Sequence, residues 1–112
     1  MIMALVDLLV KDRWLKTEII IDAFKKIKRE DFLPNDLKSL SEENRALPIG
    51  YGQTISQPLT VAFMFELLQP KKGDKILDVG SGSGWTTALL AEIVRGESLP
   101  AGRQGKVIAI EI

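Results

Sequence analysis

A run of alternating glycines between two apolar segments constrains the fold of this chain more than any other feature. The segment "KILDV" at residues 75–79 is a short apolar run that predicts a buried β-strand. The glycine loop "GSGSG" at residues 80–84 follows it directly, and "WTTALLAEIVR" at 85–95 predicts a helix. A second β-branched run, "KVIAIEI" at 106–112, predicts another strand. This order predicts an α/β unit with parallel strands and a right-handed crossover.

The glycine loop indicates a ligand site. Glycine permits positive φ and lets a ligand approach the backbone where a Cβ would collide. The loop is also expected at the carboxyl end of a strand, where open α/β sheets bind ligands. A phosphate-binding P-loop would close with Gly-Lys-Ser/Thr and a dinucleotide fold would use G-x-G-x-x-G, and the sequence has neither. The alternative is a tight strand-to-helix turn built from small residues.

Two acidic residues narrow the choice of ligand. Asp78 directly precedes the loop, where it would repel a pyrophosphate but suit an amine or sulfonium. Glu111, at the end of the second strand, is placed to accept hydrogen bonds from ribose hydroxyls. A cationic amino-acid nucleoside satisfies both, and S-adenosylmethionine is the common cofactor of that kind. Gly80 lies 31 residues before Glu111, and "ESLPAGRQG" accounts for the extra length as a surface loop away from the ligand.

Apolar periodicity predicts three further helices. Residues 1–10 favour a short amphipathic helix over a signal peptide, because Asp7 interrupts the apolar run. Residues 17–32 predict a helix with Thr17 as its N-cap, and residues 58–68 predict another. The polar segment "SLSEENRALP" between them predicts a loop. The residues expected on buried faces are Ile20, Ala23, Phe24 and Ile27 in the second helix and Val61, Met64, Phe65 and Leu68 in the third.

Composition excludes several kinds of chemistry. The chain has no cysteine and no histidine, so disulfides, thiol nucleophiles, imidazole bases and the usual zinc sites are absent. Fifteen basic and fifteen acidic residues give a formal net charge of zero, without the strong field that attracts nucleic acid or anionic membranes. We therefore expect a cytoplasmic protein with no metal, nucleic-acid or membrane partner.

The stretch "PIGYGQTISQP" at residues 48–58 raises a separate question. A connection needs turn residues, but it does not need Gln53, Thr54 and Ser56 between them. Ser56 could be the N-cap of the helix that starts at Pro58. That role leaves Gln53 and Thr54 unexplained, so a functional site is favoured, and both roles can hold together.

Three stretches resemble the protein-L-isoaspartate O-methyltransferases: "LPIGYGQTISQP", "ELLQPKKGDKILDVGSGSGWTTALLAEI" and "KVIAIEI". The similarity runs from about Ile20 to the last residue, and "GQTISQP" is its most specific part. The resemblance implies N-terminal helices and an active-site loop in residues 1–57. It also implies the first β-α-β unit of a Rossmann-like class I methyltransferase sheet in residues 58–112. Family sequences continue beyond this point, so we expect an incomplete cofactor domain.

The resemblance also implies roles for individual residues. Ser56 is expected to be the active-site residue of an enzyme that transfers a methyl group from S-adenosylmethionine to L-isoaspartyl carboxylates in damaged proteins. The residues expected to bind the cofactor are Gln53, Thr54, Ile55, Asp78, Gly80, Ser81, Gly82, Gly84 and Glu111. Two departures affect the expected substrate fit: Trp85 replaces the usual tyrosine, and "EENRALP" lacks a tyrosine common in the family.

Two alternatives stay open at this point. One is a class I methyltransferase that acts on a small molecule, and the other is a fragment without turnover. The chain ends within its second predicted strand, which favours the fragment. We therefore expect the 112-residue chain to be inactive by itself and to self-associate through an unpaired sheet edge.

Overall fold

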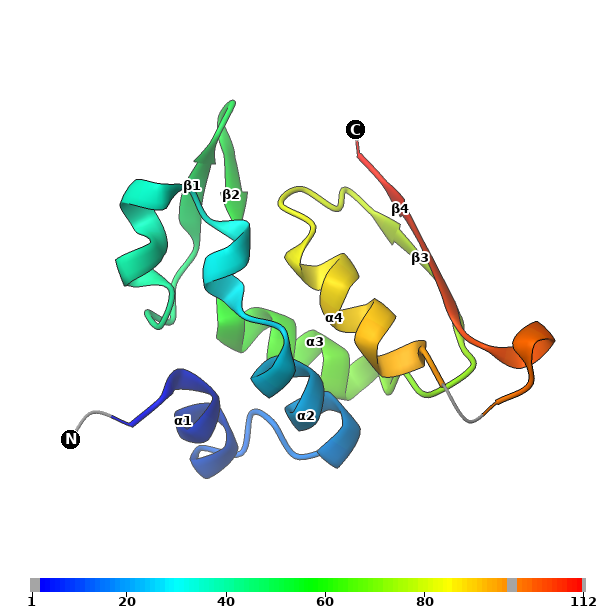
Figure 1. Cartoon of the computed structure of the whole chain (residues 1–112). Helices are drawn as coiled ribbons and strands as arrows, with labels where there is room; N and C mark the ends of the chain where they lie inside the picture. The colour runs from blue at the N-terminus through cyan, green and yellow to red at the C-terminus, as the bar shows by residue number, and fades with distance from the viewer. Residues whose placement is uncertain (1–2, 97–98, 112) are drawn as a thin grey trace.

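The computed structural model describes residues 3–96 and 99–111. It shows N-terminal helices, a β-hairpin and a β-α-β unit, in that order (Figure 1). The α-helices are α1 (Leu5–Lys11), α2 (Glu18–Lys26), α3 (Pro58–Leu68) and α4 (Trp85–Val94). The strands are β1 (Leu47–Gly50), β2 (Gln53–Ile55), β3 (Lys75–Val79) and β4 (Lys106–Ile110). Short 3-10 helices occupy Arg29–Phe32, Asn35–Leu40 and Ala101–Arg103. The predicted α/β class is confirmed.

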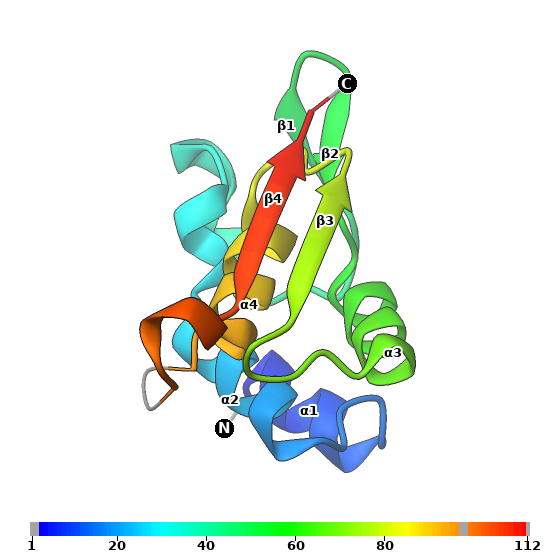
Figure 2. The ribbon, with the colours of Figure 1, turned by 90° about the vertical axis from the view of Figure 1, so that its right-hand side faces the viewer.

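Strands β3 and β4 pair in parallel, as predicted. Their register runs from Lys75 opposite Lys106 to Val79 opposite Ile110. Helix α4 connects them behind the sheet in Figure 2, which makes the crossover right-handed. The glycine loop and the end of β4 therefore meet at one edge of the sheet.

Only one face of this sheet is covered. On the face towards α4, Ile76 and Val107 pack against the hydrophobic core. On the opposite face, Leu77 is 57% and Ile108 is 52% exposed. The prediction of a buried strand at residues 75–79 therefore holds for one face only among the described residues. Successive side chains of a strand point to opposite faces, and the face turned to the viewer in Figure 2 has no helix over it.

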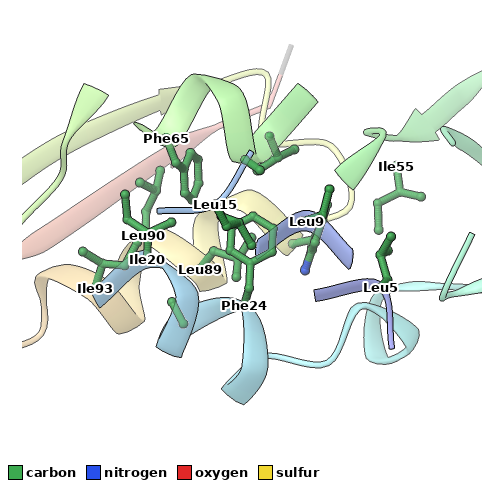
Figure 3. Packing of buried hydrophobic residues seen from close by; sticks show 14 of the residues in the cluster. Leu5, Leu9, Leu15, Ile20, Phe24, Ile55, Phe65, Leu89, Leu90 and Ile93 are labelled. Atoms are coloured by element: carbon green, nitrogen blue, oxygen red, sulfur yellow. The ribbon is translucent and has the colours of Figure 1, made fainter. Parts of the chain in front are cut away.

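A single hydrophobic core joins the N-terminal helices to the β-α-β unit. Phe24 of α2 makes edge-to-face contacts with Phe65 of α3 and Trp85 of α4, with ring centroids 6.1 and 5.8 Å apart. Figure 3 shows these helices converging on the cluster. The residues of the cluster that were predicted on buried faces are Ile20, Ala23, Phe24, Val61 and Phe65. Ile27 packs against the edge of the cluster.

Helix α3 departs from its predicted burial. Val61 and Phe65 are buried, but Met64 is 59% and Leu68 is 58% exposed. Placing these last two in the core was therefore wrong. The helix is apolar almost all round, so its periodicity does not define which face is buried.

The second helix is shorter than predicted. It ends at Lys26, and Ile27 adopts an extended conformation that turns the chain into the 3-10 helix at Arg29–Phe32. Thr17 occupies the predicted N-cap position but makes no capping bond with its side chain. Its hydroxyl instead donates a 2.6 Å hydrogen bond to Glu66 of α3. The polar segment predicted as a loop contains the end of a second 3-10 helix and the first residues of β1.

No helix in the described part of the chain combines the length and apolar character needed to cross a bilayer.

Candidate functional site

The stretch "PIGYGQTIS" forms a hairpin that the sequence analysis did not predict. β1 and β2 pair antiparallel, and Tyr51 and Gly52 form a two-residue turn with φ of 54° and 71°. Positive φ at both positions is the requirement of a type I′ hairpin turn. The usual signal for such a turn is Asn-Gly or Asp-Gly, so a tyrosine in the first position hides it. Of the two turn residues, only Gly52 is of a type that favours the positive φ of this turn.

Ser56 lies immediately after this hairpin, on the surface. Its carbonyl accepts a 3.0 Å hydrogen bond from Nη2 of the buried Arg29. The N-cap of α3 is Gln57, whose side chain makes no capping bond, and the Leu59 amide in the first turn donates instead to Asn44 Oδ1 at 2.9 Å. The alternative that Ser56 is the helix cap is therefore wrong. Its hydroxyl forms no hydrogen bond within the described residues, so that hydroxyl is available to a ligand.

The other residues of the loop differ in exposure. Gln53 and Thr54 are exposed on β2. Ile55 is only 1% exposed, and its side chain belongs to the core. Ile55 therefore anchors the end of β2 in the core, and the next residue, Ser56, lies on the surface.

The glycine loop adopts the conformation that the sequence analysis expected of it. Gly80, Gly82 and Gly84 have φ of 73°, 54° and 89°, a region that other residues rarely adopt. Among the described residues other than its chain neighbours, a Cβ built on Gly80 would meet no atom within 4 Å, and one on Gly82 would meet only the Gly80 carbonyl at 4.0 Å. The surface over these two residues is therefore open to a ligand that approaches the backbone.

The end of β4 fixes the start of the loop. The Ile110 carbonyl accepts hydrogen bonds from the amides of Gly80 at 2.6 Å and Ser81 at 3.2 Å. The Ser81 carbonyl in turn accepts one from the Gly84 amide at 3.0 Å. These backbone bonds fix the first and last residues of the loop.

Asp78 and Glu111 lie on either side of this loop. The Asp78 carboxylate accepts hydrogen bonds from the hydroxyls of Thr86 at 3.0 Å and Thr87 at 2.7 Å, in the first turn of α4. The Glu111 carboxylate accepts a hydrogen bond from the Gly82 amide. The structure thus brings both acids predicted from the sequence to the glycine loop, where their charge favours a cationic ligand.

The hairpin and the glycine loop face the same end of the molecule. In Figures 1 and 2 the tip of the hairpin and the carboxyl ends of β3 and β4 all lie at the top. Arg29 connects the two regions, because its guanidinium bonds to Ser56 and lies 5.3 Å from the ring centroid of Trp85, at the start of α4. Arg29 was not among the residues that the sequence pattern predicted as functional.

The described residues contain no group of three or more His, Cys, Asp or Glu that could hold a metal ion.

A parallel β-α-β unit with a left-handed glycine loop and an acid after the second strand defines a Rossmann-like α/β protein. Ligand sites of that class lie at the carboxyl edge of the sheet. The family model of protein-L-isoaspartate(D-aspartate) O-methyltransferase (PCMT) matches residues 2–112. The chain belongs to this family.

Individual relatives agree with that assignment. A protein-L-isoaspartate O-methyltransferase of Dictyoglomus thermophilum is 52% identical over 85 residues, which are 76% of this chain and 39% of the relative. A solved protein-L-isoaspartate O-methyltransferase is 30% identical with a TM-score of 0.78, covering 96% of this chain and 32% of the other.

A second solved structure shows the same fold. It is a Plasmodium falciparum beta-aspartate methyltransferase (PCMT) in complex with S-adenosyl-L-homocysteine, 24% identical with a TM-score of 0.78. The match covers 96% of this chain and 47% of that protein. The chain therefore spans less than half the length of these relatives.

Proposed function

We propose that this chain provides the cofactor loop and the substrate loop of a protein-L-isoaspartate O-methyltransferase. The enzyme would transfer a methyl group from S-adenosylmethionine to the free carboxylate of L-isoaspartyl residues in damaged proteins. The observation that carries this proposal is the open backbone surface at Gly80 and Gly82, with Asp78 and Glu111 beside it. Family membership supports it, and so does the Plasmodium relative solved with S-adenosyl-L-homocysteine.

The cofactor would lie against the glycine loop. A Cβ at Gly80 or Gly82 would project into open space beside the loop, so glycine at both positions fits a close approach of the ligand to the backbone. Asp78 suits the amine or sulfonium of the cofactor, and Glu111 suits its ribose hydroxyls. The remaining residues proposed to line the cofactor are Gln53, Thr54, Ser81 and Gly84, together with the backbone of Ile55, whose side chain lies in the core.

Ser56 would orient the substrate. Its exposed hydroxyl could hydrogen-bond the isoaspartyl carboxylate, which is already ionised at neutral pH and needs no general base. This chemistry is compatible with a chain that lacks histidine and cysteine. When bound, S-adenosylmethionine supplies an electrophilic methyl group. The protein contributes alignment of the two reactants, which is worth up to about 7–11 kcal/mol in well-oriented systems.

We propose that residues 1–57 mainly serve the substrate and residues 58–112 the cofactor. One hydrophobic cluster contains residues from both parts, so the division concerns roles and not separate cores. A cytoplasmic location is part of the same proposal, because a protein-repair methyltransferase acts where S-adenosylmethionine is made.

The 112-residue chain by itself is proposed to turn over weakly or not at all. Leu77 and Ile108 are exposed on the uncovered face of the sheet, and β3 has no partner except β4 among the described residues. Open strand edges and apolar faces favour association. We therefore propose that the chain self-associates through this edge and face.

The test of the cofactor site compares two glycine variants, in a version extended to the length of the relatives, by calorimetric titration with S-adenosyl-L-homocysteine. Gly82→Val is expected to reduce the affinity at least tenfold, because the side chain enters the ligand space and φ is positive. Gly102→Val is the matched control, because a Cβ there meets no atom of the described residues within 4 Å and its φ is not in the left-handed region. Equal affinity for the extended version with and without Gly82→Val would refute the proposed site.

The substrate is tested separately by methylation assays that compare an isoaspartyl peptide with a panel of small carboxylic acids. These assays require a version extended to the length of the relatives. Methylation of the peptide alone supports the proposal, and methylation of a small molecule alone would assign the chain to another class I methyltransferase.

A further inference from the structure

Arg29 is the one buried charged residue in the described part of the chain, 7% exposed. Its Nη1 donates hydrogen bonds to the carbonyls of Ser41 at 3.2 Å and Glu43 at 3.1 Å. Its Nη2 donates to the carbonyls of Arg45 at 2.7 Å and Ser56 at 3.0 Å. A single planar guanidinium thus ties four backbone carbonyls, three from the segment before β1 and one from the end of the hairpin.

The segment that carries Arg29 also contacts the glycine loop. The Arg29 guanidinium stacks on Trp85, the first residue of α4, with Cζ 5.3 Å from the ring centroid. Phe32, in the same 3-10 helix, lies 3.9 Å from the position of a Cβ on Gly84. The Arg29–Phe32 segment therefore touches both loops of the proposed site.

This arrangement is costly as a means of stabilising a core. Burial lowers the pKa of the Arg29 guanidinium, and the nearby Glu42 carboxylate offsets this in part. The Arg29 Nε and the Trp85 Nε1 are buried without a hydrogen-bond partner among the described residues, which adds a further desolvation cost. Apolar side chains of similar volume often stabilise such a position as well or better. What they cannot do is hold four carbonyls at fixed distances.

We propose that Arg29 is a positioning residue that fixes Ser56 relative to the glycine loop. It does not touch a substrate, but acts through the Ser56 carbonyl on one side and the Trp85 ring on the other. The importance of this position for catalysis rests on the proposed function. The hydrogen bonds from Arg29 to the four carbonyls are present in the chain without a ligand. The positioning role of Arg29 and the proposed function can therefore be refuted separately.

The first test uses the unaltered chain and nuclear magnetic resonance. Hydrogen bonds to four carbonyls should stop rotation of the Arg29 guanidinium, so its Nη protons should give separate resonances that exchange slowly with water. An averaged, rapidly exchanging Arg29 signal, like that of an exposed arginine, would overturn the proposal. This measurement does not depend on any variant folding.

The second test compares Arg29→Lys with Arg45→Lys. Lysine keeps the charge but lacks the planar fork that reaches several carbonyls. Arg45 is exposed, in the same segment, and pairs through its side chain with Glu43, so its replacement is the matched control.

In Arg29→Lys, amide exchange at residues 53–57 is expected to rise at least tenfold, and the carbonyl-carbon shift of Ser56 to move. Exchange in β3 and α4 should change less than twofold. A uniform rise in all elements would assign Arg29 a merely stabilising role, and an unchanged hairpin would show that the charge alone suffices. Failure of S-adenosyl-L-homocysteine to bind a version extended to the length of the relatives would overturn the proposed function, but it would leave the Arg29 hydrogen bonds to the four carbonyls unaffected.

Discussion

Apolar side chains lie on both sides of the β3–β4 sheet, but they differ in how far they are exposed to solvent. On the α4 side, Leu89 and Ile93 are fully buried against the N-terminal helices. On the opposite side, Leu77 and Ile108 are more than half exposed. Residue type is alike on the two sides, so the difference lies in which elements the chain supplies to cover each face. The apolar character of a strand shows that its side chains favour burial. Whether they are buried depends on whether another element of the fold packs on that face.

The largest expected effect compares a leucine on each side. Leu89→Ala should lower the free energy of unfolding by about 2–5 kcal/mol, because it removes buried methyl groups and leaves a cavity. Leu77→Ala should change it by less than about 0.5 kcal/mol. Urea unfolding monitored by circular dichroism measures both. Equal losses would show that the open face is covered in solution.

The open face can also be tested for self-association. Leu77→Lys combined with Ile108→Lys places two charges on the uncovered face, and we expect the dissociation constant for self-association to rise at least tenfold. Sedimentation velocity measures this, with Leu8→Lys on an exposed position of α1 as the control. If the unaltered chain is a monodisperse monomer, the proposed self-association is wrong. If it also methylates an isoaspartyl peptide at ordinary enzyme rates, the proposal of weak turnover is wrong as well.

Ser56, exposed at the end of the hairpin, provides a further contrast. Because its side chain caps no helix, Ser56→Ala should change the free energy of unfolding by less than about 0.5 kcal/mol, below the ~1 kcal/mol typical of a lost cap. In a version extended to the length of the relatives, methylation of an isoaspartyl peptide should fall at least tenfold. Loss of stability with an unchanged rate per folded molecule would mean that Ser56 has only a structural role.

The smallest expected effect concerns Glu66, which ties α3 to the start of α2. Its carboxylate accepts hydrogen bonds from the Lys16 amide at 2.7 Å and from the amide and hydroxyl of Thr17 at 2.8 and 2.6 Å. Partial burial raises the pKa of the Glu66 carboxyl, but the hydrogen bonds from Thr17, Lys16 and Gln69 outweigh it and lower the pKa.

A lowered pKa in the folded state means that the stabilisation is present above the unfolded pKa and is lost as pH falls through the folded pKa. Glu66→Gln should therefore cost at most about 1 kcal/mol at pH 7, after allowance for solvent screening. The difference from the unaltered chain should shrink as pH falls below the usual value of 4.5. Urea unfolding at pH 7 and pH 3 measures it, and a constant difference would contradict the assignment.

Much of the candidate site could be located from the sequence. Gly80, Gly82 and Gly84 needed left-handed backbone conformations, and that requirement is local to the loop. The parallel strands and the helix between them followed from short apolar runs of the right length. These features place Asp78 and Glu111 at the same sheet edge without reference to the remainder of the chain.

Other features could not be located from the sequence. The burial of Arg29 depends on carbonyls 12 to 27 residues away along the chain, and Glu66 binds Thr17 across 49 residues. The hairpin turn depends on a tyrosine in a left-handed conformation, which its residue type does not favour.

The sequence by itself thus determined the glycine loop, the order of the β-α-β unit and the family to which the chain belongs, because local conformational demands and a specific motif encode them. The tertiary structure alone decided which faces are buried, that Met64 and Leu77 are exposed, and that Arg29 lies between the two loops. Burial and long-range hydrogen bonds arise only when distant segments meet, and periodicity along one segment does not say which partner will cover it.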